Sequence, residues 1–207
     1  MEALVVDDHP VVRAAVAMLL RKAGFLHIHE ASTGSEVLPK IREHKPDLVV
    51  LDLVMPGLDG LDVLARIRAS GMKCRVLVFT SQEPLHYQDR CMRAGAEAYV
   101  SKTNNLDHLQ KAMGAVMAGY SYFVKLPSSS VALNALQRTE AQMIERLSDR
   151  ELTIFQCLSQ GMSNKDIGKR LNLSHKTIST YKVRLIEKLH VKSGVFLRDI
   201  AKRNHVI

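Results

Sequence analysis

Short apolar runs that end in polar residues mark the first half of the chain. Four of them, at 3–6, 48–51, 76–79 and 98–100, are rich in Val and Leu. Runs of this length, bounded by turn residues, are typical of buried strands. A weaker run at 27–31 supplies a fifth predicted strand.

Between these strands the apolar residues recur with helical spacing. The pattern predicts helices near 10–23, 34–44, 60–69, 84–94 and 105–118, the first ended by Gly24 and the last by Gly119. Strands that alternate with helices predict an α/β doubly wound, parallel sheet. We expect the flavodoxin-like order 2-1-3-4-5, which brings the ends of the first and third strands together.

The pattern changes after this region. Residues 123–146 are expected to be a linker, because Pro127-Ser128-Ser129-Ser130 breaks the periodicity, although 131–146 favours part of a helix. Residues 147–207 predict helices only, with start signals at Ser148-x-x-Glu151 and Ser163-x-x-Asp166. A tight turn at 171–174 between two helices predicts a helix-turn-helix within a small all-α four-helix domain. The predicted division is therefore 1–122, 123–146 and 147–207.

Charge is unevenly shared between the two parts of the chain. Residues 1–125 hold 15 Lys+Arg against 14 Asp+Glu, whereas residues 126–207 hold 14 against 7. A basic block joined to a near-neutral one suggests a module for an anionic polymer such as DNA, although a solvated basic face explains the charge equally well. The three cysteines lack metal spacing, and no signal peptide or membrane span is visible, so a cytoplasmic protein is expected.

Polar residues of a particular set follow the predicted strands. Asp7 and Asp8 follow the first strand, Asp52 the third, Thr80 ends the fourth, and Lys102 follows the fifth. Clustered carboxylates repel unless a cation neutralises them, and oxygen ligands suit Mg²⁺. A carboxylate beside Mg²⁺ can accept a phosphoryl group, which a hydroxyl and an ammonium can then bind. Taken singly, each Asp is better explained as a strand-end cap, and it is the combination of five such residues at successive strand ends that favours a phosphoryl site.

On these motifs the chain resembles a two-component response regulator of the NarL–FixJ class, with a receiver domain and a LuxR-type helix-turn-helix. The resemblance implies that Asp52 is the phosphoacceptor and that Mg²⁺ is held by Asp7, Asp8, Asp52 and the backbone carbonyl of Val54. It also implies that Thr80, Tyr99 and Lys102 form the switch, although Tyr99 could be plain strand packing. Thr103 departs from the proline common in this class, which puts the shape of the following loop in doubt.

The predicted recognition helix is 175–189, and its base-reading and phosphate-binding residues can be separated by position. Ser179, Thr180 and Val183 lie one turn apart and could face the major groove together, unless they are merely exposed. The residues expected to meet phosphates or border the helix are Lys165, Lys176, Thr177, Lys182, Arg184 and Lys188.

The resemblance further implies a phosphorylation-dependent transcriptional regulator rather than an enzyme, apart from self-phosphorylation and slow autodephosphorylation. Its expected partners are paired DNA half-sites, a sensor histidine kinase or phosphotransfer protein, RNA polymerase, and a second copy when phosphorylated. Apolar residues crowd the last helix, so Val195 and Phe196 are expected at the dimer interface, unless Phe196 packs within the chain.

Three other functions are compatible with parts of this sequence. A phosphatase that uses an aspartyl phosphate would need a general acid two residues after Asp52, where this chain has Val54. A DNA-binding protein whose first domain is only a dimerisation platform would not need the acidic set, but the sequence leaves it open. A ligand-sensing LuxR-type regulator would not need Asp7, Asp8, Asp52 and Lys102 together.

Overall fold

The computed structural model describes residues 1–56, 58–103, 106–124 and 135–207. The chain divides into two compact units, Met1–Lys125 and Leu126–Ile207. The expected break at Pro127-Ser128-Ser129-Ser130 lies outside the described residues. Within the parts of the chain that the structure describes, no helix has both the length and the apolarity of a membrane span.

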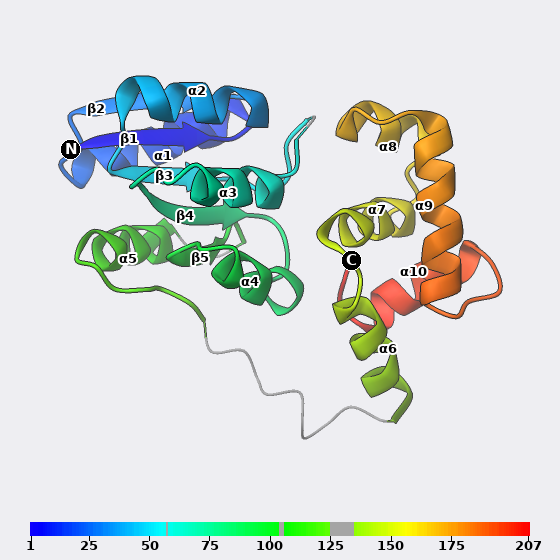
Figure 1. Ribbon diagram of the computed structural model, residues 1–207. Coiled ribbons are helices and arrows are strands. Elements are labelled where there is room, and N and C mark those ends of the chain that lie inside the picture. Colours follow the sequence, from blue (N-terminus) through cyan, green and yellow to red (C-terminus); the bar gives the residue numbers. More distant parts are fainter. Residues whose placement is uncertain (57, 104–105, 125–134) are drawn as a thin grey trace. The chain divides into compact units, whose positions relative to one another are not determined.

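The first unit is built on a five-stranded parallel sheet (Figure 1). Its strands are β1 (Glu2–Val6), β2 (His27–Ala31), β3 (Leu48–Leu51), β4 (Arg75–Thr80) and β5 (Ala98–Ser101). They lie in the order β2-β1-β3-β4-β5, which confirms the predicted topology. Val6 pairs in register with Leu51, and Leu51 with Val78, so the polar residues that follow these strands emerge at one edge.

Helices cover both faces of this sheet (Figure 1). Helices α1 (Pro10–Lys22) and α5 (Leu106–Met117) pack on one face, against alternate strand residues such as Ala3, Val50 and Phe79. Helices α2 (Gly34–His44), α3 (Gly60–Ala69) and α4 (Pro84–Arg93) lie on the other. Both faces of the strands are thereby buried, which explains why the central strands read as continuous apolar runs.

The chain leaves the first unit along the edge strand β5. Tyr122 forms an isolated parallel bridge with Ala98, and its backbone N–H donates to the carbonyl of Glu97 at 2.9 Å. Its carbonyl accepts the N–H of Tyr99 at 3.0 Å. These bonds occupy part of the free edge of β5 and hold residues up to Val124 against the unit.

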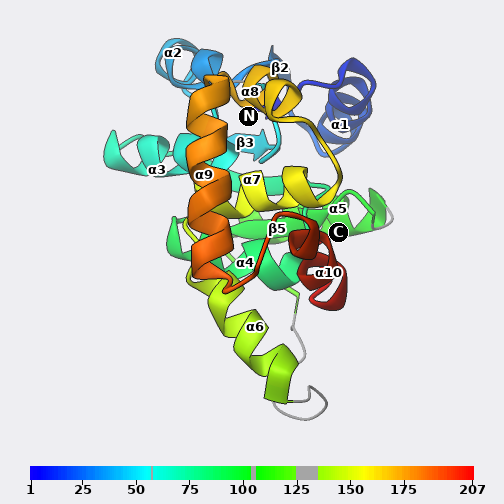
Figure 2. The same ribbon diagram turned by 90° about the vertical axis from the view of Figure 1, so that its right-hand side faces the viewer.

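The second unit is entirely helical in its described part (Figure 2). It contains α6 (Ala135–Glu145), α7 (Asp149–Ser159), α8 (Asn164–Leu171), α9 (His175–Lys188) and α10 (Val195–Arg203). The hydroxyl of Ser148 accepts the Glu151 N–H, and the Glu151 side chain accepts the Ser148 N–H, which confirms the predicted capping box. A Cβ on Gly168 would lie 2.6 Å from the Leu173 carbonyl oxygen, so glycine permits the tight helix-turn-helix.

Helix α6 lies within the segment that was expected to be a linker. Its Glu140 is almost fully buried, binds Arg203 at 2.7 Å and accepts a hydrogen bond from Asn204 at 2.8 Å. Ile144 and Leu147 are buried with the helical core. This helix therefore joins the four predicted ones, whereas the exact boundaries at 122 and 147 stay predictions.

Candidate functional site

The ends of β1, β3 and β5 bring two carboxylates to one ammonium group. The Nζ atom of Lys102 lies 2.6 Å from Asp7 Oδ2 and 2.7 Å from Asp52 Oδ2. Asp7 is 2% exposed and Asp52 3% exposed. Two carboxylates this deeply buried need a neutralising cation, and Lys102 supplies part of that charge.

The backbone around Asp52 fixes the direction of its side chain. The N–H of Val54 donates to Asp52 Oδ1 at 3.2 Å. A Cβ on Gly60 would lie only 2.5 Å from the Asp52 carbonyl oxygen, so only glycine lets α3 begin this close to the end of β3. The side chain of Asp59 accepts the Leu61 N–H at 3.0 Å and caps the same helix. The end of β3 that carries Asp52 is thus packed against the start of α3.

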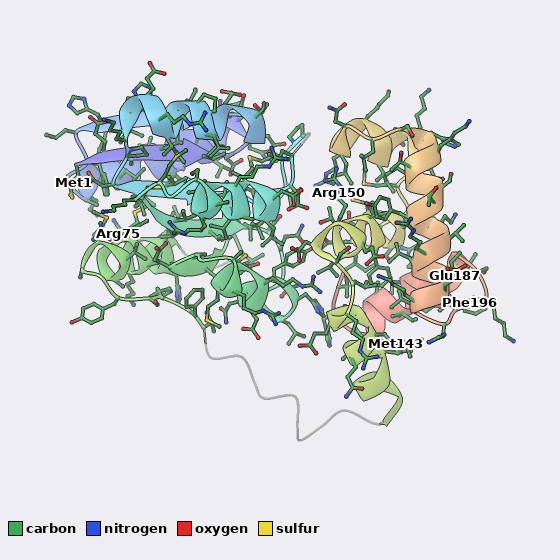
Figure 3. The ribbon with its side chains drawn as sticks, viewed as in Figure 1. Met1, Arg75, Met143, Arg150, Glu187 and Phe196 are labelled. Atoms are coloured by element: carbon green, nitrogen blue, oxygen red, sulfur yellow. The ribbon has the colours of Figure 1, made fainter. Side chains whose placement is uncertain are left out.

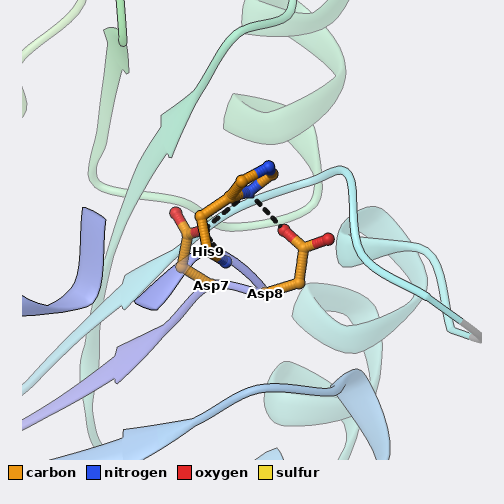
Figure 4. A group of neighbouring side chains, drawn as sticks. All are labelled: Asp7, Asp8 and His9. Atoms are coloured by element: carbon orange, nitrogen blue, oxygen red, sulfur yellow. Dashed lines mark hydrogen bonds and ion pairs between the residues drawn. The ribbon is translucent and has the colours of Figure 1, made fainter. Parts of the chain in front are cut away.

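Asp8 lies beside this pair and carries a buried oxygen without a hydrogen bond. No described residue forms a hydrogen bond with Asp8 Oδ1, although His9 Nδ1 lies 2.7 Å from it (Figure 4). Ligand atoms of Asp7, Asp8 and His9 all lie within 4.8 Å of one another. Asp52 is not part of this group. It is linked to Asp7 through Lys102, whose Nζ contacts both carboxylates.

These donors fit a hard cation. A buried carboxylate oxygen without a hydrogen bond, next to further carboxylates, is an environment that suits Mg²⁺. His9 is the N-cap residue of α1, and its N–H donates to Asp7 Oδ1 at 2.8 Å. That bond orients Asp7 from the start of the helix, which is a positioning role for His9.

Burial and charge act in opposite directions on the site. Burial raises the pKa of Asp52 above its ordinary value, and Lys102 opposes this rise without cancelling it. Burial lowers the pKa of Lys102, but Asp52 and Asp7 outweigh it and hold that pKa above its ordinary value. Lys102 is therefore charged at neutral pH.

Thr80 and Tyr99 are both fully buried and meet at Gln82. The Thr80 hydroxyl accepts the Gln82 N–H at 3.4 Å, and the Tyr99 hydroxyl donates to the Gln82 carbonyl at 2.8 Å. Burial raises the pKa of the Tyr99 phenol, so it stays a neutral donor. The loop between β4 and α4 is thus bonded to both predicted switch residues.

The turn after Lys102 is shaped by hydroxyl groups rather than by proline. The hydroxyl groups of Ser101 and Thr103 lie 2.7 Å apart, and the Thr103 N–H donates to Ser101 Oγ at 3.3 Å. The Lys102 N–H donates to the Thr80 carbonyl at 2.7 Å. Lys102 keeps its position next to Asp52 despite the Thr103 departure.

The predicted recognition helix is α9, and it begins at a Ser174 cap. Thr180 and Val183 are exposed on one face, with Val183 at 55%. Ser179 is half-buried, and its Oγ accepts a hydrogen bond from Asn164 Nδ2 of α8 at 3.1 Å. Among the residues predicted to meet phosphates, Lys165, Lys176, Arg184 and Lys188 are exposed, and Thr177 and Lys182 are half-buried.

Two of the predicted phosphate-binding lysines are partly engaged within the unit. Lys188 Nζ lies 2.7 Å from Glu151 Oε2. Lys182 lies beside the α9–α10 connection, because a Cβ on Gly194 would come 2.7 Å from its Cε atom. Their roles in binding DNA stay predictions.

The last helix presents an apolar surface. Val195 is 77% exposed and Phe196 47% exposed. Phe196 also borders a pocket of about 430 Å³ between α6, the end of α9 and α10. Met143 and Phe196, both labelled in Figure 3, line it with Leu189, Val191 and Ile200.

Comparison with known families divides the chain as the fold does. Residues 3–114 match the response regulator receiver domain, and residues 145–201 match the bacterial regulatory proteins of the luxR family. The chain belongs to the two-component response regulators with a LuxR-type DNA-binding domain.

Relatives of this response regulator extend over its whole length. It is 47% identical over 203 residues to the virulence factors putative positive transcription regulator BvgA of Bordetella pertussis, covering 98% of this chain and 97% of BvgA. It is 32% identical over 206 residues to the DNA-binding transcriptional activator EvgA of Escherichia coli, covering 100% of both. The response regulator RcsB of Salmonella typhimurium shares the fold, with a TM-score of 0.72, 21% identity and coverage of 99% and 98%.

Several residues of these sites carried no signal in the sequence. Gln82, Asn164 and Glu140 are single polar residues that bond to partners in other elements. A capping residue can be recognised from its spacing, as Ser148 and Ser163 were. A side chain that bonds to a distant backbone or hydroxyl group leaves no such pattern.

Proposed function

We propose that the response regulator accepts a phosphoryl group on Asp52 from a phosphohistidine donor and thereby changes its affinity for DNA. The observation that carries this proposal is the contact of Lys102 with both Asp52 and Asp7. A carboxylate oxygen of Asp52 would attack phosphorus, the P–N bond would break, and the imidazole would leave as the neutral base after taking a proton. The donor is a sensor histidine kinase or a phosphotransfer protein.

The acidic residues have separate roles in this reaction. Asp7, Asp8, Asp52 and the carbonyl of Val54 would hold Mg²⁺, which supplies charge neutralisation for the attacking and phosphoryl oxygens. His9 and Arg13 position Asp7, since the His9 N–H bonds its side chain and Arg13 Nη1 donates to its carbonyl at 2.9 Å. Lys102 would exchange its contact with Asp52 for one with the phosphoryl oxygens.

The switch would work through the loop at Gln82. A phosphoryl group on Asp52 would offer the Thr80 hydroxyl proton a more highly charged acceptor than the Asp52 carboxylate, while the Thr80 oxygen accepts the Gln82 N–H at 3.4 Å. Movement of Thr80 would change the loop that also holds the Tyr99 hydroxyl through Gln82. The phosphoryl group would thus favour one of two existing conformations of the first unit.

The output is binding of paired half-sites in double-stranded DNA. Val183 and Thr180 supply the exposed face for base contacts, with Ser179 at its margin. Phosphates would be met by Lys165, Lys176, Thr177 and Arg184, and by Lys182 and Lys188 if they leave their present contacts. A dimer through Val195 and Phe196 of α10 would align two such helices, and RNA polymerase would then be recruited.

Intact-mass measurement tests the phosphoacceptor. Wild type, Asp52→Asn and Asp62→Asn are incubated with acetyl phosphate and Mg²⁺, and Asp62 is an exposed residue of α3 that serves as the matched control. Wild type and Asp62→Asn should gain one phosphate, and Asp52→Asn or wild type in EDTA should gain none. An undiminished adduct in Asp52→Asn would refute the assignment.

A further inference from the structure

Two neighbouring hydroxyl groups on α9 are bonded in opposite ways. Ser179 Oγ accepts a hydrogen bond from Asn164 Nδ2 at 3.1 Å. Thr180 Oγ1 donates its proton to the carbonyl of Lys176 at 3.1 Å. The Ser179 hydroxyl thus acts as an acceptor, whereas the Thr180 hydroxyl has already donated its only proton.

This difference fixes what each hydroxyl can offer to a base. A hydroxyl has one proton and two lone pairs. The proton of Ser179 has no acceptor among the described residues, so it is available to an outside acceptor. Thr180 retains lone pairs only, so it can accept but not donate. Asn164 occupies one of the two Ser179 lone pairs, which restricts rotation of the hydroxyl and favours its use as a donor. Without Asn164 that bias would be lost.

Base edges in the major groove differ in the same property. Guanine N7 and O6, adenine N7 and thymine O4 are acceptors, whereas adenine N6 and cytosine N4 are donors. A hydroxyl that is free to rotate satisfies both kinds and discriminates poorly. A hydroxyl with a fixed polarity favours one kind.

We propose that Asn164 is a positioning residue that sets base preference: it holds Ser179 as a donor that selects an acceptor base edge, next to Thr180 as an acceptor that selects a donor edge. Asn164 is suited to this because it is the first residue of α8, whose start is fixed by the Ser163 cap. This inference rests on the proposed binding of DNA by α9.

The substitution Asn164→Asp tests the polarity directly. An ionised carboxylate cannot donate, so it would take the Ser179 proton and leave Ser179 lone pairs facing the base. Preferred sites are selected from a random duplex pool by full-length protein treated with acetyl phosphate and Mg²⁺. The base position that depends on Ser179 is identified by comparing wild type with Ser179→Ala.

At that position wild type should favour acceptor bases, and Asn164→Asp should shift the preference toward adenine N6 or cytosine N4 by about two- to tenfold. Asn164→Ala should relax the base preference at that position. If Asn164→Asp binds DNA too weakly for selection, the Asn164→Ala result tests the inference instead. Lys169→Gln, an exposed change of equal charge on α8, should weaken binding without altering the preference.

The double variant Asn164→Asp/Ser179→Ala separates this role from a direct contact of residue 164 with DNA. In the Ser179→Ala background the substitution at 164 should leave the preference unchanged. The inference is overturned if the shift persists there, or if both Asn164→Asp and Asn164→Ala keep the wild-type preference. Wild type that selects no site would refute DNA binding itself, and the inference with it.

Discussion

Gln88 of α4 and Val124 are joined by two hydrogen bonds. Gln88 Nε2 donates to the Val124 carbonyl at 2.8 Å, and the Val124 N–H donates to Gln88 Oε1 at 3.0 Å. The amide thus imitates the pairing of a strand neighbour, and Gln88 is 4% exposed. Val124 is the last described residue before the second unit, so α4 holds the chain where it leaves the first unit.

We call this pair of hydrogen bonds between Gln88 and Val124 the clamp. We predict that the clamp transmits the effect of phosphorylation at Asp52 to the segment that joins the two units. Gln88→Leu should accept phosphate on Asp52 at the normal level but lose most of the phosphorylation-dependent gain in DNA affinity. Residues 120–124 should also exchange their amide hydrogens faster, because Val124 loses its N–H partner. Gln110→Leu on α5 is the control. An unchanged affinity gain together with faster exchange would show that the clamp is structural only.

Thr80 should be needed for output and not for phosphate uptake. Thr80→Ala removes the hydroxyl that would bind the phosphoryl oxygens in our proposal, whereas Thr80→Ser retains it. Phosphate uptake is measured by intact mass, and DNA affinity by titration with and without acetyl phosphate. Thr80→Ala should gain phosphate without a gain in affinity, and Thr80→Ser should recover at least part of that gain. Normal activation of Thr80→Ala would contradict the coupling role.

Glu151 should stabilise the helical unit in a pH-dependent way. Burial raises the pKa of Glu151, but hydrogen bonds from Lys188 and Ser148 outweigh it and hold that pKa below its ordinary value. A carboxyl whose folded pKa is lowered contributes stability above its unfolded pKa, about 4.3, and loses it as the pH falls through the folded value.

Glu151→Gln should therefore lower the free energy of unfolding by about 1–2 kcal/mol at pH 7. The difference from wild type should shrink below about pH 4. Calorimetry at both pH values measures it, with Glu187→Gln, an exposed residue of α9 labelled in Figure 3, as the control. A difference that is independent of pH would show that the Glu151 charge contributes nothing.

Phe196 should be required for cooperative binding to paired half-sites. It stands 47% exposed at the rim of an apolar pocket, so a second copy could bury it. Phe196→Glu should keep the affinity for a single half-site and lose the added affinity for two. Lys202→Gln is the control, because it lowers the charge of the same helix by the same amount. It should keep the added affinity for two half-sites. Full cooperativity and a dimer mass for phosphorylated Phe196→Glu would exclude α10 as the interface.

The sequence predicted the parts of this structure that rest on local patterns. The apolar runs before Asp7 and Asp52 identified their strands, and parallel pairing then placed both residues at one edge. The Ser148 and Ser163 caps were visible because their partners lie three residues away.

Long-range polar contacts were not predictable in the same way. Gln88 and Val124 are 36 residues apart, and Asn164 and Ser179 are 15 apart, so their meeting depends on how whole elements pack. The sequence predicted part of a helix at 131–146 but did not show that this helix belongs to the second unit. That placement depends on the long-range pairing of Glu140 with Arg203. Lys182, which is expected to reach phosphate, lies beside Gly194, a neighbour that its position along the chain does not indicate. Its role in binding DNA stays a prediction.

The most direct test of the central claim is the DNA affinity of full-length protein with and without acetyl phosphate, for wild type and Asp52→Asn, at one salt concentration. The phosphodonor should tighten binding of wild type to paired half-sites and leave Asp52→Asn unchanged. Equal tightening of Asp52→Asn, or unchanged affinity of wild type whose mass shows the phosphate adduct, would contradict the account.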